Sequence, residues 1–244
     1  MIKFIDHTKM GRGIHGWLDS HFHFSFAEYY NPNNLQFGVL RVVNDDLVQP
    51  GTGFDTHPHQ NMEIISYVVD GELTHKDSMG NEHTLSRGQV QYMSAGTGVF
   101  HSEYNHGTKT LRFFQIWIFP DKKGYQPNYG DFPFTFEDRI DAWLPIATLV
   151  ENAQSSAPIK IHADINLFAA FISPGKSLDF SLGADRQAYL VDIEGSLGLS
   201  GKNGAEAKLS MRDAAEITGE SFTATAGADA GAHVLVIEMA REGA

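Results

Sequence analysis

The sequence predicts an all-β protein. Its apolar segments are short, rich in β-branched and aromatic residues, and separated by Gly, Asn and Asp, a pattern typical of β-sandwiches and β-barrels. Helical periodicity is scarce, and only residues 137–144 suggest one or two helical turns. With 42% apolar residues, including 17 Phe, the chain of 244 residues is long enough to bury a sizeable core.

The expected strands follow one another along the whole chain. The clearest segments are Phe37–Val43, Met62–Val69, Gln89–Met93, Leu111–Phe119, Leu167–Ile172, Ala188–Ile193 and His233–Met239. Residues 120–135 combine charged, Gly, Pro and aromatic residues, which predicts a packed linker rather than a strand. We therefore expect two domains, over residues 1–135 and 136–244.

The two halves of the chain are weakly alike. Ser66–Leu73 (SYVVDGEL) is similar to Ala188–Leu197 (AYLVDIEGSL), because each is an apolar strand that runs into an acidic turn containing glycine. This similarity favours a tandem repeat of one β-architecture.

Composition excludes several classes of protein. Eighteen basic and 30 acidic residues give a net charge of −12, and no basic stripe is present, so we expect no nucleic-acid partner. Because the chain has no cysteine, histidine and carboxylate must carry any metal chemistry. No segment has the length of an apolar membrane span, and the first residues lack the apolar region of a signal peptide, so we expect a cytoplasmic protein without membrane contact.

Two pairs of metal-ligating residues have strand spacing. Side chains two apart share one face of a strand, so His57 and His59 can reach one point, as can His101 and Glu103. The His-x-His spacing alone is weak evidence for a metal site, because 12 histidines in 244 residues give roughly 0.6 such pairs by chance. A second such pair is indeed present, at His21 and His23.

The surrounding frame is more specific. Gly51-x5-His57-x-His59-x3-Glu63 and the later Gly88-x5-Ser94-x-Gly96 resemble the two cupin motifs, although Ser94 stands where cupins usually have proline, and His101 lies two residues further from the glycine. WLDSHFHFSFAEYY, LRVVNDD, GFDTHPHQNMEI, THKDSMGN, QYMSAGTGVFHSEYN and QIWIFP, within residues 10–120, are similar to the pirin family of bicupins. The resemblance is thinner over the second half. It implies a cupin-superfamily fold of two tandem, jelly-roll-like β-barrels.

The resemblance also implies a metal site. In this family, the positions of His57, His59, His101 and Glu103 hold the metal. Three imidazoles and one carboxylate suit a divalent transition metal, with iron favoured and nickel, copper, manganese and zinc as alternatives.

Several other histidines and one glutamate lie outside the four family positions. Glu63 is expected to support a ligand more than to be one, and roles for His23 and His75 stay open. The second half holds only His162 and His233, so we expect its domain to be a degenerate cupin without metal. The aromatic set that includes Phe22 and Phe26 is expected to be barrel core.

The family implies two kinds of function. Bacterial members are associated with quercetin 2,3-dioxygenase activity, in which O2 opens a flavonol and carbon monoxide is released, and Glu103 would act as the base. Animal members are associated with transcriptional regulation through protein partners. A cupin isomerase or epimerase is a third class. The acidic net charge and the carboxylate among the ligands favour the dioxygenase.

Overall fold

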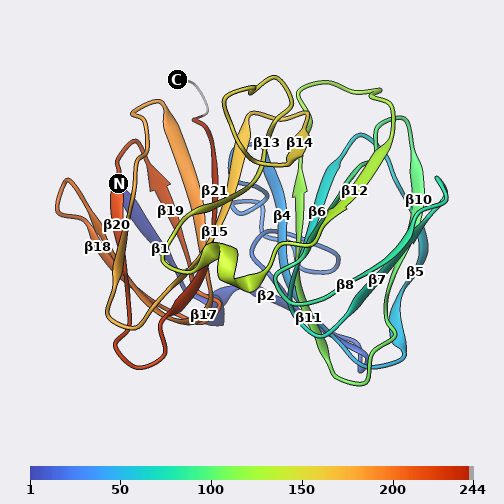
Figure 1. The fold of residues 1–244 in the computed structure, drawn as a ribbon, viewed down its shortest axis with the longest axis horizontal. Helices are drawn as coiled ribbons and strands as arrows, with labels where there is room; N and C mark the ends of the chain where they lie inside the picture. The colour runs from blue at the N-terminus through green and yellow to red at the C-terminus, as the bar shows by residue number, and fades with distance from the viewer. Residues whose placement is uncertain (242–244) are drawn as a thin grey trace. The chain divides into compact units, whose positions relative to one another are not determined.

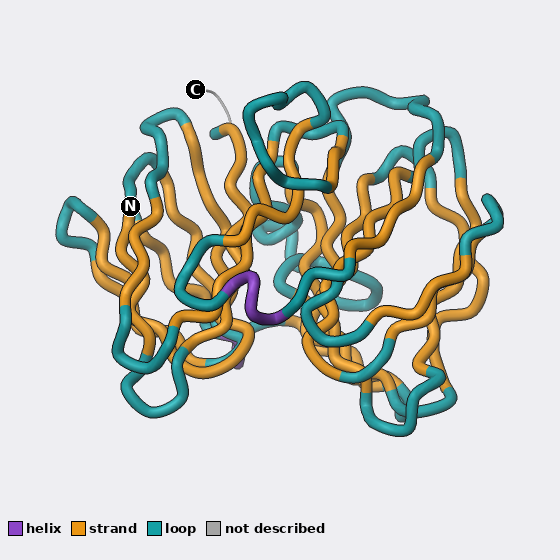
Figure 2. The backbone as a smooth tube through the Cα atoms, viewed as in Figure 1, coloured by secondary structure: helices purple, strands orange, loops and turns teal. Residues whose placement is uncertain are grey.

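The computed structural model of the protein describes residues 1–241, and these residues form an almost entirely β structure (Figures 1 and 2). Helix in this part of the chain is limited to two short 3-10 turns, η1 (His7–Lys9) and η2 (Phe136–Arg139), and the second overlaps the start of the segment 137–144 for which helical turns were expected. None of the helices in residues 1–241 has the length and apolar character needed to cross a bilayer. The all-β prediction is confirmed.

Contacts divide the chain into two units. The N-terminal unit comprises residues 10–135 and 161–163, and the C-terminal unit comprises residues 1–9, 136–160 and 164–244. The first nine residues, expected in the first domain, therefore belong to the C-terminal unit. The reason is strand pairing: β1 (Ile2–Ile5) is antiparallel to β19 (Ala214–Thr218), and Ile2 packs on the core of that unit.

Two antiparallel sheets build the N-terminal unit. The larger has the order β12 (Asn128–Phe132), β9 (Val90–Ser94), β6 (Glu63–Asp70), β11 (Leu111–Ile118), β4 (Leu40–Val48), β3 (Leu18–Phe22) and β2 (Gly11–Ile14). The smaller has the order β5 (Thr52–His59), β10 (Val99–Asn105), β7 (Leu73–Asp77) and β8 (Glu82–Leu85). Strand β10 alternates strictly, with Val99, His101, Glu103 and Asn105 buried, because successive side chains point to opposite faces.

Strand β12 lies inside the segment that was predicted as a linker. It pairs with β9, and Gly130 lies opposite Tyr92. A Cβ atom at Gly130 would come within 2.6 Å of the Tyr92 ring, so the glycine that made the segment unlike a strand is what lets it pair closely there.

The interior of the N-terminal unit is layered along its strands. One apolar cluster includes Val68 and Phe113, and another includes Ile64 and Met93. Ser66 lies midway between Ile64 and Val68 on the same face of β6, so a polar layer separates the two apolar ones. The register aligns four residues of this polar layer side by side, namely Asn44, Gln115, Ser66 and Gln91.

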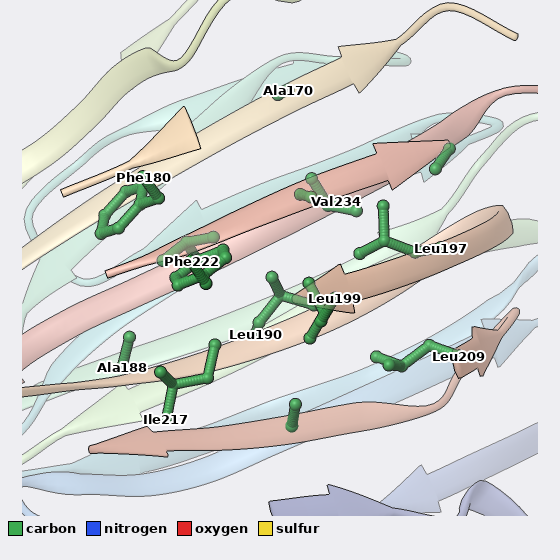
Figure 3. Packing of buried hydrophobic residues seen from close by; sticks show 14 of the residues in the cluster. Ala170, Phe180, Ala188, Leu190, Leu197, Leu199, Leu209, Ile217, Phe222 and Val234 are labelled. Atoms are coloured by element: carbon green, nitrogen blue, oxygen red, sulfur yellow. The ribbon is translucent and has the colours of Figure 1, made fainter. Parts of the chain in front are cut away.

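Strand β17 (Arg186–Gly201) is shared by both sheets of the C-terminal unit. One sheet has the order β1, β19, β17, β21 (Ala232–Ala240), β15 (Ile165–Ile172), β13 (Leu144–Leu149) and β14 (Ile159–Ile161). The far half of β17 pairs with β18 (Glu206–Ser210) and β20 (Phe222–Ala226), and β20 also pairs with β16 (Ser177–Phe180). Its interior is an apolar cluster in which Phe180 stacks on Phe222 with ring centroids 5.2 Å apart (Figure 3).

Candidate metal centre

Strands β5 and β10 bring three histidines together. The two strands lie side by side (Figure 1), and in their antiparallel register His57 lies opposite His101, and His59 lies opposite Val99. Strand β5 is an edge strand, which tolerates Pro58 between the two histidines because the missing N–H costs no central ladder bond. The predicted convergence of His57, His59 and His101 is therefore observed.

The three rings face one another closely. The Nε2 atoms of His57 and His101 are 3.1 Å apart. The ring centroids are 4.5 Å apart for His57 and His101, and 4.8 Å apart for each of the other two pairs. One nitrogen from each ring lies within 4.8 Å of the other two. Such an arrangement directs three lone pairs toward one small volume.

Burial keeps the imidazoles of His59 and His101 neutral. It lowers the pKa of His59 to about 3, and the neighbouring His101 and His57 lower it further. Burial likewise lowers the pKa of His101 to about 3, with smaller contributions from His57 and His75. At neutral pH both rings are therefore unprotonated, which is the form that donates a lone pair to a metal ion.

Hydrogen bonds to the opposite ring nitrogens fix the orientation of two of these rings. His57 Nδ1 lies 2.7 Å from the backbone carbonyl oxygen of Asp55. His101 Nδ1 lies 3.4 Å from Nδ1 of His75, whose Nε2 is 3.1 Å from Asp77 Oδ2. Both Nε2 atoms are thereby turned toward the shared volume.

His75, whose role the sequence left open, thus supports a predicted ligand. Its side chain is fully buried on β7, and Tyr129 stacks on it with ring centroids 4.4 Å apart. Burial would raise the pKa of Asp77, but hydrogen bonds from Asn81 and His75 outweigh it and lower that pKa. The carboxylate is therefore ionised, and it holds the ring of His75 in place. The i, i+2 spacing of His75 and Asp77 was the available sequence signal.

Glu103 lies beside His101 but makes different contacts. A β-bulge between the two residues shifts Glu103 relative to β5, so that it pairs with Phe54. Its carboxylate accepts hydrogen bonds from three side chains of the polar layer. These are Ser66 (2.9 Å) and Gln91 (2.8 Å) to Oε1, and Gln115 (2.6 Å) to Oε2. Glu103 clusters within 4.8 Å with His75 and His101, and it lines a cavity together with His57 and His59.

Glu63 is not among the clustered residues. It pairs with Ser94 on the neighbouring strand, whose hydroxyl donates to Glu63 Oε1 at 2.8 Å, and His162 Nδ1 lies 3.3 Å from the same oxygen. Burial raises the pKa of Glu63, and both of these contacts oppose that rise. Its neighbour Ile64 belongs to the interior cluster, so strand alternation turns Glu63 to the other face of the sheet.

His23 also lies outside the clustered residues. It is buried just beyond the end of β3, with its ring 6.3 Å from that of Phe114. The His21 and His23 pair therefore belongs to the packing of the larger sheet.

A cavity of about 640 Å³ is lined by His57 and His59 of the cluster. Its walls are largely aromatic. Three pairs of rings pack edge to face. The ring centroids are 5.5 Å apart for Phe26 and Trp117, 4.8 Å for Trp117 and His59, and 5.1 Å for Trp17 and Phe54. Phe22 and Phe26, expected as barrel core, thus contribute to the cavity wall. The cavity can take a planar, mostly apolar molecule of drug-like size.

The cavity wall also holds polar residues that the sequence reasoning missed. Asp46 is buried there, and the hydroxyl of Ser20 donates to its Oδ1. Burial raises the pKa of Asp46 to about 7; the Ser20 hydrogen bond opposes this rise, and the charges of Asp45 and Glu103 add to it. Asp45, on the opposite face, is instead paired with Arg112 through two 2.8 Å hydrogen bonds. Adjacent aspartates thus have different environments.

These features define a bicupin: two units, each built from antiparallel β-sheets, with a histidine cluster inside the first. Protein-family models agree. Residues 5–118 match the family described as Pirin, and residues 148–239 match the quercetinase C-terminal cupin domain. The chain belongs to the pirin family.

Relatives support this assignment over most of the chain. A pirin-like protein of Caulobacter vibrioides is 43% identical over 223 residues, covering 91% of this chain and 93% of the relative. A quercetin 2,3-dioxygenase of Escherichia coli K12 is 38% identical over 195 residues, covering 80% of this chain and 82% of the relative. The structure of a bacterial pirin from Escherichia coli in complex with nickel(II) is similar, with a TM-score of 0.86 and 34% identity, covering 98% of this chain and 99% of that one.

Proposed function

We propose that His57, His59 and His101 hold one divalent transition-metal ion and that Glu103 is the fourth ligand. The donor set supports this proposal, because three imidazoles converge, two of them held neutral by burial, and a carboxylate lies next to His101. A nickel ion in the similar Escherichia coli pirin supports it further. Iron was favoured from the sequence, and nickel is the second ion to test.

We further propose that the protein is a metal-dependent dioxygenase that opens a flavonol such as quercetin with O2 and releases carbon monoxide. The observation that carries this proposal is the aromatic-walled cavity that is lined by His57, His59 and Glu103. Relatives named quercetin 2,3-dioxygenase support the choice of substrate class. Flavonols are planar, and their size suits a cavity of about 640 Å³.

Each part of the site then has a role. A bound metal ion supplies Lewis acidity, which lowers the pKa of a hydroxyl that coordinates it. Glu103 would take the proton of the substrate hydroxyl at Oε2, where only Gln115 donates among residues 1–241, provided that this oxygen is not coordinated to the metal ion at that moment. The donors on Oε1 keep the carboxylate from rotating away. The aromatic walls, among them Phe26 and Trp117, stack on the rings and exclude water.

Metal analysis combined with an activity assay tests both proposals. Wild-type protein should bind close to one metal ion per chain and should consume O2 and release carbon monoxide with quercetin. His57→Ala and His101→Ala should lose the metal and the activity. His106→Ala is the matched control, because His106 is exposed and stacks on Tyr104, 5.4 Å away, outside the cluster. Full metal occupancy in both ligand variants would refute the metal site.

Glu103→Gln separates binding from catalysis. It should keep much of the metal while turnover falls by orders of magnitude, since the amide cannot accept the proton. Turnover at the wild-type rate would mean that the base lies elsewhere; Asp46 then becomes the next carboxylate to test, since Glu63 faces away. If metal-loaded wild type consumes no quercetin, the regulatory, protein-binding function takes precedence.

A further inference from the structure

The cavity wall opposite the smaller sheet has a polar strip on β3 and β4. Asn44 and Asp46 are two apart on β4, so both side chains point to the same face as Gln115, the cross-strand partner of Asn44. Ser20 lies opposite Asp46 in the register and donates to its Oδ1. Gln115 in turn donates to Glu103, so the strip connects with the metal end of the cavity.

The strip contains acceptors that the protein itself does not use. Asn44 is 3% exposed, and no donor in residues 1–241 reaches its Oδ1. In the same part of the chain, the Ser20 bond to Oδ1 is the one hydrogen bond to Asp46, which leaves Oδ2 free. Buried polar atoms almost always have a partner, so unpaired acceptors beside a cavity indicate a ligand that donates to them.

The remaining cavity wall favours an aromatic ligand. Phe22, Phe26 and Trp117 line the same cavity and favour a planar, apolar body. Two features argue against a cationic ligand that donates through an ammonium group. Asn44 carries no charge, and the pKa of Asp46, raised to about 7 by burial, leaves a substantial neutral fraction at neutral pH. A neutral hydroxyl suits both residues, because it donates to Asn44 Oδ1 and can either donate to the ionised Asp46 carboxylate or accept from its protonated form.

We propose that Asn44 and Asp46, with Ser20 orienting the Asp46 carboxyl group, form a subsite that binds hydroxyl groups on an aromatic ring of the substrate remote from the metal. The proposal rests on the proposed function, because it takes the cavity as the substrate site. It adds a specificity: the preferred substrates are polyhydroxylated flavonols, and those without hydroxyls beyond the metal-binding 3-position are bound less tightly.

Binding of two flavonols to nickel-loaded protein without oxygen tests the subsite independently of turnover. Quercetin and 3-hydroxyflavone share the metal-binding oxygens and differ in their remaining hydroxyls. Isothermal titration should give wild-type protein an affinity for quercetin about tenfold or more above that for 3-hydroxyflavone, as expected for at least one buried hydrogen bond. Asn44→Leu should remove most of this preference by weakening quercetin binding alone. Ser20→Ala, a milder change on β3, should reduce the preference in the same direction.

The alternatives give different results. Asp46→Asn keeps the acceptor for Ser20 and places an amide N–H donor where the protonated acid has its O–H, so it serves as the conservative control and should retain most of the preference. Binding of 3-hydroxyflavone at wild-type affinity demonstrates that each variant is folded and metal-loaded. The subsite is refuted if wild type has no preference or binds neither flavonol, or if Asn44→Leu keeps the full preference or weakens both ligands equally. If wild type prefers quercetin but never consumes it, the proposed reaction fails while the subsite stands.

Discussion

Replacing Asp46 by asparagine should change how the stability of the N-terminal unit depends on pH. Asp46 lies buried beside the cavity without a basic partner, and burial raises the pKa of its carboxyl group from 3.8 to about 7. Folding therefore favours the protonated acid. Asp46→Asn keeps the size of the side chain and the acceptor for Ser20 but removes the titration.

The size of the effect follows from the pKa difference. A raised pKa contributes stability that is fully present below about pH 4, where both states are protonated, and is lost as the pH rises through 7. The difference of about 3 pKa units corresponds to about 4 kcal/mol in total. Between pH 5 and pH 8 the wild type should lose about 2.5 kcal/mol that the variant does not lose.

Urea denaturation of metal-free protein at several pH values measures this difference. A Trp143→Phe background leaves Trp17 and Trp117, both in the N-terminal unit, as the fluorescent reporters. Ser20→Ala removes the hydrogen bond that lowers the pKa of Asp46, so that pKa should rise further. The pH-dependent loss of stability in this variant should therefore extend to higher pH than in the wild type. Parallel stability curves for wild type and Asp46→Asn from pH 5 to 8 would refute the reasoning.

Three further changes test other parts of the structure. Asp77→Asn should lower metal affinity about 10- to 100-fold in a chelator competition, because the His75 ring that supports His101 loses its carboxylate; unchanged affinity would contradict this. Gly53→Ala should disrupt β5 and release metal, since its Cβ would come within 2.3 Å of the Glu103 carbonyl oxygen. Gly51→Ala is the control: its Cβ would point into open space, and its positive φ should lower the free energy of unfolding by only about 1 kcal/mol, measured by thermal or urea unfolding. Phe222→Ala should destabilise the C-terminal unit by about 3–5 kcal/mol, followed through Trp143 fluorescence, and a loss below 1 kcal/mol would contradict the packing in Figure 3.

Local patterns predicted most of the strands and the convergence of the three histidines, although β4 (Leu40–Val48) begins and ends later than the predicted Phe37–Val43. Met62–Val69 and Leu111–Phe119 each correspond within one residue at either end to β6 and β11, because apolar runs bounded by turns need little tertiary information. The same is true of His57 and His59, whose spacing on one strand fixes their common face. Long-range pairing then adds His101 directly opposite His57.

The parts that escaped prediction depend on register between distant strands. Nothing near Gln91 or Gln115 indicates that both donate to Glu103, since this follows only from the alignment of β9, β6 and β11. Asp46 has no motif of its own, and its role arises from Ser20 on the adjacent strand. Pairing of β1 with β19 likewise joins segments far apart in the chain, which local propensity cannot reveal.

The position of β21 has a consequence for biosynthesis. This strand follows every other strand of its sheet in the chain, yet it lies between β15 and β17 in the middle of that sheet. Until it emerges, those two apolar strands each present an unpaired edge, and such edges recruit other chains. A nascent chain that stalls before Ala232 therefore exposes unpaired strand edges in the C-terminal unit. Residues 10–163, in contrast, already contain every segment of the N-terminal unit. Termination before β21 should thus produce aggregates that retain an intact histidine cluster, and chaperones would be needed mainly until β21 emerges.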